Sequence, residues 1–363
     1  MTSVPVVLPE IARYLKIGPV AQTWLVTTPL VCFCVVALTV PWLVRWFGEE
    51  RLIFGAVAFV LVGTLLRTVW AVEGLFSGTV ITSSGIGTLN VVLSSLIKRR
   101  APHRAGVLIG MYLLMLYVGA MAGSGLSVPL MRMEHGSVLE SLRTWAVLGG
   151  IALVAWTPQL GRRCEWTKGR ETKRPGNLGS AVWRLAGFMG TQNVVYYATV
   201  SFLPILFRGR GASALHAGFL VSLTSVGGLA TVLIVPVVVH RWECGRLLVA
   251  PTALITGCGI LAALVAPMSS EAVWMLLLGA SEGSALALAI SLTVSRATNA
   301  EASARLSGAS QSVGYGLAAG GLFLTGLLHE VTRGWGVSAA ALVVLCGMEL
   351  AFGWLSVGAV AVV

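Results

Sequence analysis

The chain alternates between long apolar segments and short polar breaks along its whole length. A helix needs about 20 apolar residues to cross a bilayer core of roughly 30 Å, and the apolar segments have about that length, except for a shorter first one. Helices can cross because their backbone hydrogen bonds are satisfied within each segment. The pattern therefore predicts an all-α membrane protein with twelve helices. They begin near Met1, Val20, Arg51, Val72, His103, Leu139, Ser180, Ala214, Arg246, Glu271, Glu301 and Gly334.

The first segment is too short for a complete crossing. Met1 to Tyr14 extends only about 21 Å at a rise of 1.5 Å per residue. We therefore expect a truncated first helix, or a start codon that lies inside a longer reading frame.

The amino-acid composition is typical of an integral membrane protein. Of its 363 residues, 56% are hydrophobic and 11% are charged, with a mean hydropathy of +0.86, which excludes an ordinary soluble domain. The net charge of +11 could indicate a nucleic-acid partner, but its distribution favours another interpretation. If alternate breaks lie on one side, that side holds 17 of the 25 Lys and Arg residues. By the positive-inside rule this side is cytoplasmic, as is the C-terminus, and no nucleic-acid partner is expected.

The residues that would carry enzymatic chemistry do not form a recognisable pattern. The six cysteines show no CxxC spacing, which gives no support for a disulfide framework or a zinc site. All five histidines fall at predicted loop ends, which argues against a metal site or an intramembrane enzyme. No G-x4-G-K-[ST] loop occurs, so ATP-driven transport is not supported. We expect no enzyme activity, no cofactor and no metal.

Two halves of the chain resemble each other. "VPWLVRWFGEERL" (40–52) and "VPVVVHRWECGRL" (235–247) each close a second helix of six, and 108–123 resembles 306–321 in a fifth helix. The longest polar break, 161–177, separates the halves. We predict an N-terminal six-helix bundle over 1–160, a cytoplasmic linker over 161–178 and a C-terminal six-helix bundle over 179–363. Such a six-plus-six arrangement is typical of secondary transporters, whose substrate site lies between the halves near the bilayer midplane.

These features carry a family resemblance. The chain resembles the major facilitator superfamily and, within it, the cyanate/2-nitroimidazole (CynX/NimT) family. The most specific stretches are "GFMGTQNVVYYATVSFLPILF" in the seventh helix and "LSGASQSVGYGLAAGG" in the eleventh. Three features depart from the family pattern: "RWFGEER" replaces the usual cytoplasmic motif with its Asp, Glu282 replaces a Gln, and the helix 1 Arg would fall before Met1. The resemblance implies a two-bundle fold with pseudo-symmetry and transport of cyanate-like anions or nitroaromatic heterocycles.

Polar side chains at mid-membrane depth are the candidate solute contacts. At 1.5 Å per residue, Gln192, Glu282 and Gln311 each lie roughly 15–18 Å from the end of their helix. Tyr196 and Tyr315 lie one turn beyond the two glutamines and so share their helix faces. The candidate substrate-binding residues are Gln192, Tyr196, Glu282, Gln311, Tyr315, Tyr112 and Tyr117.

A structural role for these residues is the competing interpretation. Gln and Tyr can hydrogen-bond between helices, and Gly316 with Gly320 forms a GxxxG pattern that permits close helix contact. Because several polar residues converge at one membrane depth, contact with a solute in a shared cavity is favoured over a purely structural role. Arg67 and Arg143 lie near helix ends, where they are expected to extend toward an interface as anchors.

Glu282 is the most specific candidate for a functional residue, because an ionisable group at the middle of the membrane is costly to bury. We consider two roles: a proton carrier, which makes protons a coupling partner, and a neutral group that imitates the family's Gln. Glu349, also near mid-depth but on a peripheral helix, is expected to be structural.

The sequence thus predicts a secondary active transporter of a small polar or anionic solute that works by alternating access. The alternative is a transport-inactive remnant or sensor of the same fold. The resemblance implies a monomer in the bacterial plasma (inner) membrane.

Overall fold

The protein is described from a computed structural model, which covers residues 2–100, 104–133, 137–161, 180–242, 245–295 and 300–357. Every regular element within those ranges is a helix. The N-terminal elements are α1 (Ser3–Val6), α2 (Leu8–Leu15), α3 (Pro19–Phe47), α4 (Glu49–Leu66), α5 (Ala71–Arg100), α6 (Ala105–Met133), α7 (Val138–Thr144), α8 (Ala146–Trp156) and the 3-10 helix η2 (Thr157–Gly161). The C-terminal elements are α9 (Ser180–Gly209), α10 (Ala214–Trp242), α11 (Gly245–Val265), α12 (Glu271–Ser295), α13 (Ala300–Thr332) and α14 (Trp335–Val357).

The predicted twelve-segment, all-α architecture is confirmed. The short first segment is the pair α1 and α2, the sixth is α7 with α8, and each other segment is one helix. Among the described residues, nine helical segments are long and apolar enough to cross a membrane. α4 and α9 fall outside this group. α4 has only 18 residues and begins with Glu49, Glu50 and Arg51, whereas α9 is interrupted by the polar run that supplies the site below.

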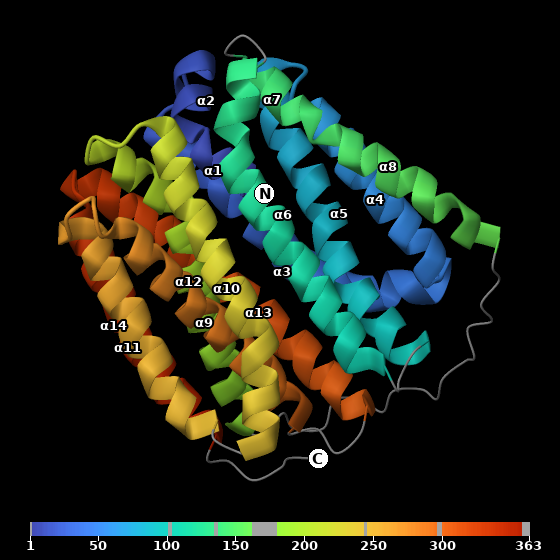
Figure 1. The fold of residues 1–363 in the computed structure, drawn as a ribbon. Coiled ribbons are helices and arrows are strands. Elements are labelled where there is room, and N and C mark those ends of the chain that lie inside the picture. The colour runs from blue at the N-terminus through green and yellow to red at the C-terminus, as the bar shows by residue number, and fades with distance from the viewer. Residues whose placement is uncertain are drawn as a thin grey trace.

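The turns between helices fall at two opposite ends of the bundle. One end carries α2 and the turns before α3, α5, α10, α12 and α14, and we call it the α2 end. The opposite end holds the turn between α3 and α4 and the start of α9, and we call it the linker end (Figure 1). The predicted linker, 161–178, lies almost entirely outside the described residues, which resume at Ser180.

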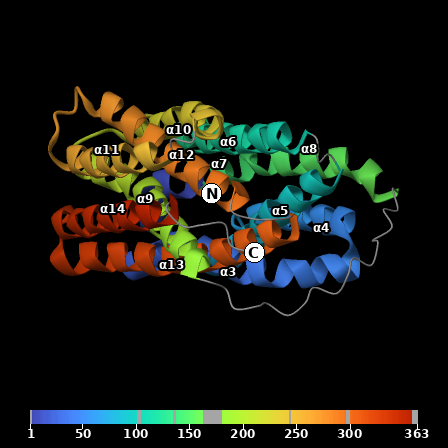
Figure 2. The same ribbon diagram turned by 90° about the horizontal axis from the view of Figure 1, so that it is seen from below.

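Six helical segments belong to each half. Figure 2 shows the bundle from below, with α11 and α14 of the C-terminal half on the left and α4 and α8 of the N-terminal half on the right. In the N-terminal half, α5 packs against α3 and α4, and α8 packs against α4. In the C-terminal half, the main pairs are α10 with α12, α9 with α13 and α14, and α11 with α12 and α14. The two halves meet mainly where α6 packs on α10 and where α3 packs on α13.

Small residues make both of these contacts close near the α2 end. A methyl group at Gly218 of α10 would lie 2.9 Å from the carbonyl oxygen of Ser124 on α6. On the other seam, a methyl group at Gly326 of α13 would lie 2.6 Å from Thr23 of α3. Glycine therefore lets the two halves approach at backbone distance, as small residues do at membrane helix contacts. Any opening of the α2 end has to separate these surfaces.

Candidate functional site

A cavity of about 480 Å³ lies between the two halves. Its walls come from α1, α3, α5 and α6 on one side and from α9, α12 and α13 on the other. The structure brings six of the seven predicted contact residues to this wall: Tyr112, Tyr117, Gln192, Tyr196, Gln311 and Tyr315. Residues from both halves therefore face one space near the middle of the bundle.

Two tyrosines of α6 form part of the N-terminal wall. The Tyr112 hydroxyl donates to Oδ1 of Asn90 on α5 at 2.5 Å, and Asn90 also lines the cavity. Tyr117 is mostly buried, because its ring packs against α10 where Gly228 has no side chain; a methyl group there would lie 2.3 Å from the ring. Tyr112 is thus held within its own half, whereas Tyr117 also contacts the other half.

The C-terminal wall depends on the polar run of α9. Gln192 is 3% exposed, and its Oε1 has no hydrogen-bond partner among the described residues. A buried amide oxygen without a partner is costly, so an acceptor that faces a cavity is a natural contact for a solute or for water. Tyr196 follows one helical turn later on the same face.

Aromatic rings from both halves form a continuous cluster along the cavity. Tyr196 and Tyr197 meet edge-to-face with ring centroids 5.1 Å apart, and Tyr197 lies 6.4 Å from Tyr315. Tyr315 in turn meets Phe33 of α3 edge-to-face at 5.3 Å. We call these four residues the aromatic wall. Such rings offer a planar solute both faces and edges for contact.

Sequence reasoning missed Tyr197, Asn193 and Phe33, all of which line the cavity. A signal for two of them existed: Asn193 and Tyr197 form a second polar pair at the same four-residue spacing as Gln192 and Tyr196. Because both pairs line the cavity, α9 presents a wider face than one stripe. Phe33 lies in an apolar run of α3 and had no comparable signal.

Glu282 lies beside the cavity and is absent from the residues that line it. It is 3% exposed on α12, and neither carboxyl oxygen has a partner with regular hydrogen-bond geometry in the described part of the chain. The Thr199 hydroxyl lies close to it but donates to the Val195 carbonyl. Other groups close enough to interact electrostatically with Glu282 are Tyr117, Tyr196, Cys346 and Glu349. Glu349, on α14, is 2% exposed, so two buried carboxyl groups lie near each other behind the tyrosines.

The structure corrects the anchor prediction for Arg67. This residue is 4% exposed and lines the cavity, whereas Arg143 is exposed and pairs with Glu140 at 3.8 Å, as expected of an anchor. The reason is the turn after α4. This turn folds back on α5. Arg67 is therefore packed against Gly78 in the interior of the bundle, although it is the C-cap residue of its own helix. The sequence alone placed Arg67 at a helix end and could not show that the turn after α4 packs against α5.

The GxxxG interpretation of α13 is also corrected. A methyl group at Gly320 would meet nothing within 4 Å, and one at Gly316 would lie 3.5 Å from Cys34. The close contact of α13 with α9 instead involves Gly314, next to Asn193, and Gly321, where a methyl group would lie 2.4 Å from Val194. Gln311 and Tyr315 remain on the cavity side of the helix.

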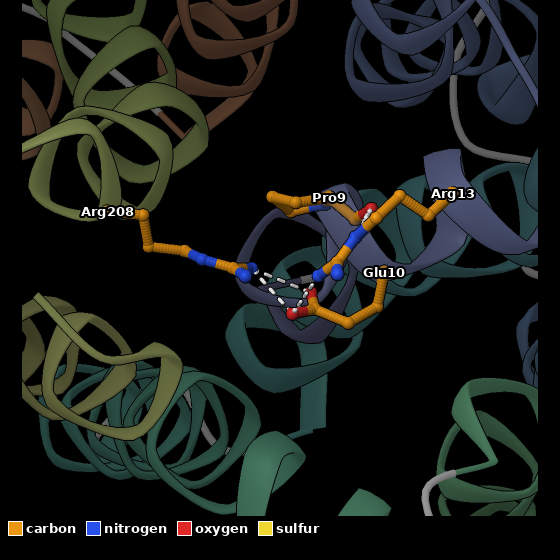
Figure 3. Close-up of polar contacts among 4 residues, drawn as sticks. All are labelled: Pro9, Glu10, Arg13 and Arg208. Atoms are coloured by element: carbon orange, nitrogen blue, oxygen red, sulfur yellow. Dashed lines mark hydrogen bonds and ion pairs between the residues drawn. The ribbon is translucent and has the colours of Figure 1, made fainter. Parts of the chain in front are cut away.

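An ion pair joins the two halves at the α2 end. Nη1 of Arg208, at the end of α9, lies 2.7 Å from Oε1 and 2.8 Å from Oε2 of Glu10 on α2 (Figure 3). Arg13 approaches the same carboxylate at 3.3 Å, and its Nε also donates to the Pro9 carbonyl. Glu10 and Arg208 are largely buried, whereas the Arg13 side chain is 72% exposed.

The chain is similar to known transporters over nearly all of its length. The profile of the Major Facilitator Superfamily matches residues 1–322. The 2-nitroimidazole transporter of Escherichia coli (strain K12) is 32% identical over 92% of this chain and 85% of its own. An uncharacterized transporter, YycB, of Bacillus subtilis (strain 168) is 33% identical over 92% of this chain and 84% of its own.

Two further similarities are more distant. The cyanate transport protein CynX of Escherichia coli (strain K12) is 25% identical over 97% of this chain and 93% of its own. The crystal structure of a D-xylose–proton symporter superposes with a TM-score of 0.72 at 14% identity, over 97% of this chain and 93% of that one. At that identity the superposition shows a shared fold.

Proposed function

This chain belongs to the major facilitator superfamily, and from that premise we propose that it moves a small polar or anionic solute across the membrane by alternating access. The proposed solute is a cyanate-like anion or a planar heterocycle of the nitroimidazole type, in line with the names of two relatives.

The observation that carries the proposal is the cavity between the halves. Its volume of about 480 Å³ falls within the roughly 300–1,000 Å³ typical of small-molecule sites. A planar solute would stack on the aromatic wall while the Gln192 amide and the tyrosine hydroxyls hydrogen-bond to its polar edge. Since the walls belong to different halves, rocking of the halves would expose the bound solute to one side and then the other.

Glu282 is our candidate for proton coupling. It interacts electrostatically with Tyr117 and Tyr196 of the cavity wall, so its protonation and the position of these rings would affect each other. A carboxyl group can bind and release a proton within a transport cycle, whereas the glutamine it replaces could not.

We further propose that the linker end and the C-terminus face the cytoplasm of a bacterial plasma membrane. The basic residues of the chain gather in the breaks on that side. A C-terminal fusion to green fluorescent protein should fluoresce, while a fusion to alkaline phosphatase should be inactive; the reverse result would contradict this orientation.

Counterflow in proteoliposomes tests the transport proposal. Vesicles loaded with unlabelled cyanate or 2-nitroimidazole should accumulate the labelled form, and Tyr315→Ala should reduce the initial rate about tenfold or more by removing a central part of the aromatic wall. Tyr14→Ala is the matched control, because Tyr14 lies on α2 and is 67% exposed. Failure to exchange any small solute would refute transport. Binding without exchange would favour the sensor alternative.

A further inference from the structure

The cavity contains a buried cation that has no counter-ion in the described part of the chain. Among the described residues that line the cavity, Arg67 is the one with a charged side chain. It is 4% exposed, and its Nε and Nη2 have no hydrogen-bond partner in the described part of the chain. No ion pair to Arg67 exists within those same residues. Buried charges in proteins are normally paired, so this group is an exception that needs a cause.

Packing of α4 on α5 holds the cation in the cavity. A methyl group at Gly78 of α5 would lie 2.7 Å from the backbone nitrogen of Arg67 and 2.8 Å from its Cγ. One at Gly74 would lie 1.7 Å from the carbonyl oxygen of Val69, so the turn after Arg67 is pressed onto the same helix. Both the root of the side chain and the turn beyond it are therefore fixed against α5, and the guanidinium cannot simply extend into solvent at the end of the bundle.

The surroundings of Arg67 favour an anion from outside the chain over an internal partner. The buried carboxyl group of Glu282 interacts with Tyr117 and Tyr196 of the cavity wall and with the buried Glu349. Arg67 is not among the groups that act on either of them. Tyr196 and Tyr315 on the cavity wall carry hydroxyl groups that can donate to an anion as well, whereas the hydroxyls of Thr79 and Tyr112 already donate to Leu75 and Asn90.

We infer that Arg67 binds the negatively charged group of the transported solute, and that the solute is a small planar anion rather than a neutral heterocycle. The inference rests on the proposed transport function and narrows its substrate class. A guanidinium matches the geometry of a carboxylate or another flat, delocalised anion through paired N–H donors. The aromatic wall would then contact the remainder of the solute. A neutral nitroimidazole would leave the cation unpaired.

The test compares two probes that differ in charge and little in shape. Nicotinate and nicotinamide share one ring, and cyanate serves as a smaller anion. Binding is measured by calorimetry on the purified full-length protein and transport by counterflow. Wild type should bind nicotinate more tightly than nicotinamide. Arg67→Gln should lose about 10-fold or more in affinity for both anions, as expected when a charged hydrogen-bond partner is removed, with nicotinamide affinity unchanged or higher. Arg67→Lys should keep part of the preference.

Arg143→Gln is the matched control, because it removes the same charge near the same end of the bundle from an exposed side chain. It should leave the preference for the anion intact. Thermal unfolding separates a binding role from a structural one. Without ligand, Arg67→Gln should melt at the same or a higher temperature than wild type, since it removes an unpaired buried charge. Added anion should then raise the melting temperature of wild type but not of the variant.

Three results would overturn the inference. The first is equal affinity of wild type for nicotinate and nicotinamide. The second is that wild type binds neither nicotinate nor cyanate. The third is an equal loss of affinity for nicotinate and nicotinamide in Arg67→Gln. Each of these can occur while counterflow of a neutral solute proceeds, in which case the transport proposal stands and the role of Arg67 falls. Absence of counterflow for every solute, together with intact anion binding at Arg67, would instead refute transport alone.

Discussion

The Glu10–Arg208 ion pair should stabilise the state in which the α2 end is closed. The pair joins α2 of one half to α9 of the other, so opening that end must break it. Two unit charges about 4 Å apart attract by about 4 kcal/mol at an effective dielectric constant of about 20. Loss of hydration offsets part of this, since the side chains are only 15% and 21% exposed. A net contribution of about 2 kcal/mol remains, which is typical of hydrogen bonds to charged groups.

Glu10→Gln keeps the shape of the side chain and removes its charge. It should shift the equilibrium toward the open α2 end by roughly 30-fold, the factor that about 2 kcal/mol represents. Arg13→Gln is the matched control: its side chain is 72% exposed, and exposed pairs contribute about 0–1 kcal/mol. It should shift the equilibrium by less than about fivefold. Exchanging the two charges, Glu10→Arg with Arg208→Glu, should restore the closed state in part.

Distances between spin labels at exposed Glu140 and Ser213 would report the equilibrium, because these residues belong to different halves at the α2 end. The labels require a background in which the six native cysteines are replaced. In Glu10→Gln a longer-distance population should grow at the expense of the short one. The reasoning is refuted if the distance distribution matches that of the unsubstituted background, or if Arg13→Gln changes it as much.

Three further predictions concern the interior. Gly321→Ala should destabilise the protein by about 1–3 kcal/mol, because the methyl group has no space against α9, whereas Gly320→Ala, which meets nothing within 4 Å, should be neutral or slightly stabilising in thermal unfolding. Glu282→Gln should flatten the pH dependence of uptake in proteoliposomes while solute affinity by calorimetry is retained; an unchanged pH profile would remove Glu282 as the proton carrier. Tyr112→Phe removes the hydrogen bond to Asn90 and should cost about 0.5–1.5 kcal/mol of stability, with a larger loss of solute affinity if the pair also orients the solute. Denaturation and binding measured on the same sample distinguish these two effects.

Much of the fold could be predicted because its cause is local. Segment length, the charge of the breaks and the repeats depend on residues close in sequence, and they were sufficient for twelve segments in two halves. The break of the first segment into α1 and α2 at Val7, and of the sixth into α7 and α8 at Trp145, was not predicted.

The candidate site was predictable to the same extent. Four of the six predicted residues on the cavity wall could be placed from the sequence, because helix rise and the four-residue spacing already put Gln192 with Tyr196 and Gln311 with Tyr315 at one depth and on one face. The same reasoning placed Glu282 at that depth, but depth does not determine the direction in which a side chain points. The rotation of α12 in its bundle puts Glu282 beside the cavity, next to Glu349.

The sequence by itself determined that this chain crosses a membrane repeatedly, in two related halves, with polar residues near the middle of the seventh and eleventh helices. Only the tertiary structure decided which of two similar arginines is buried. Arg67 and Arg143 both lie at helix ends in the sequence, yet one lines the cavity and the other faces outward. The difference arises because glycines of α5 let the end of α4 approach at backbone distance, and lateral contacts of this kind join residues from separate helices, which hydropathy and helical spacing do not register.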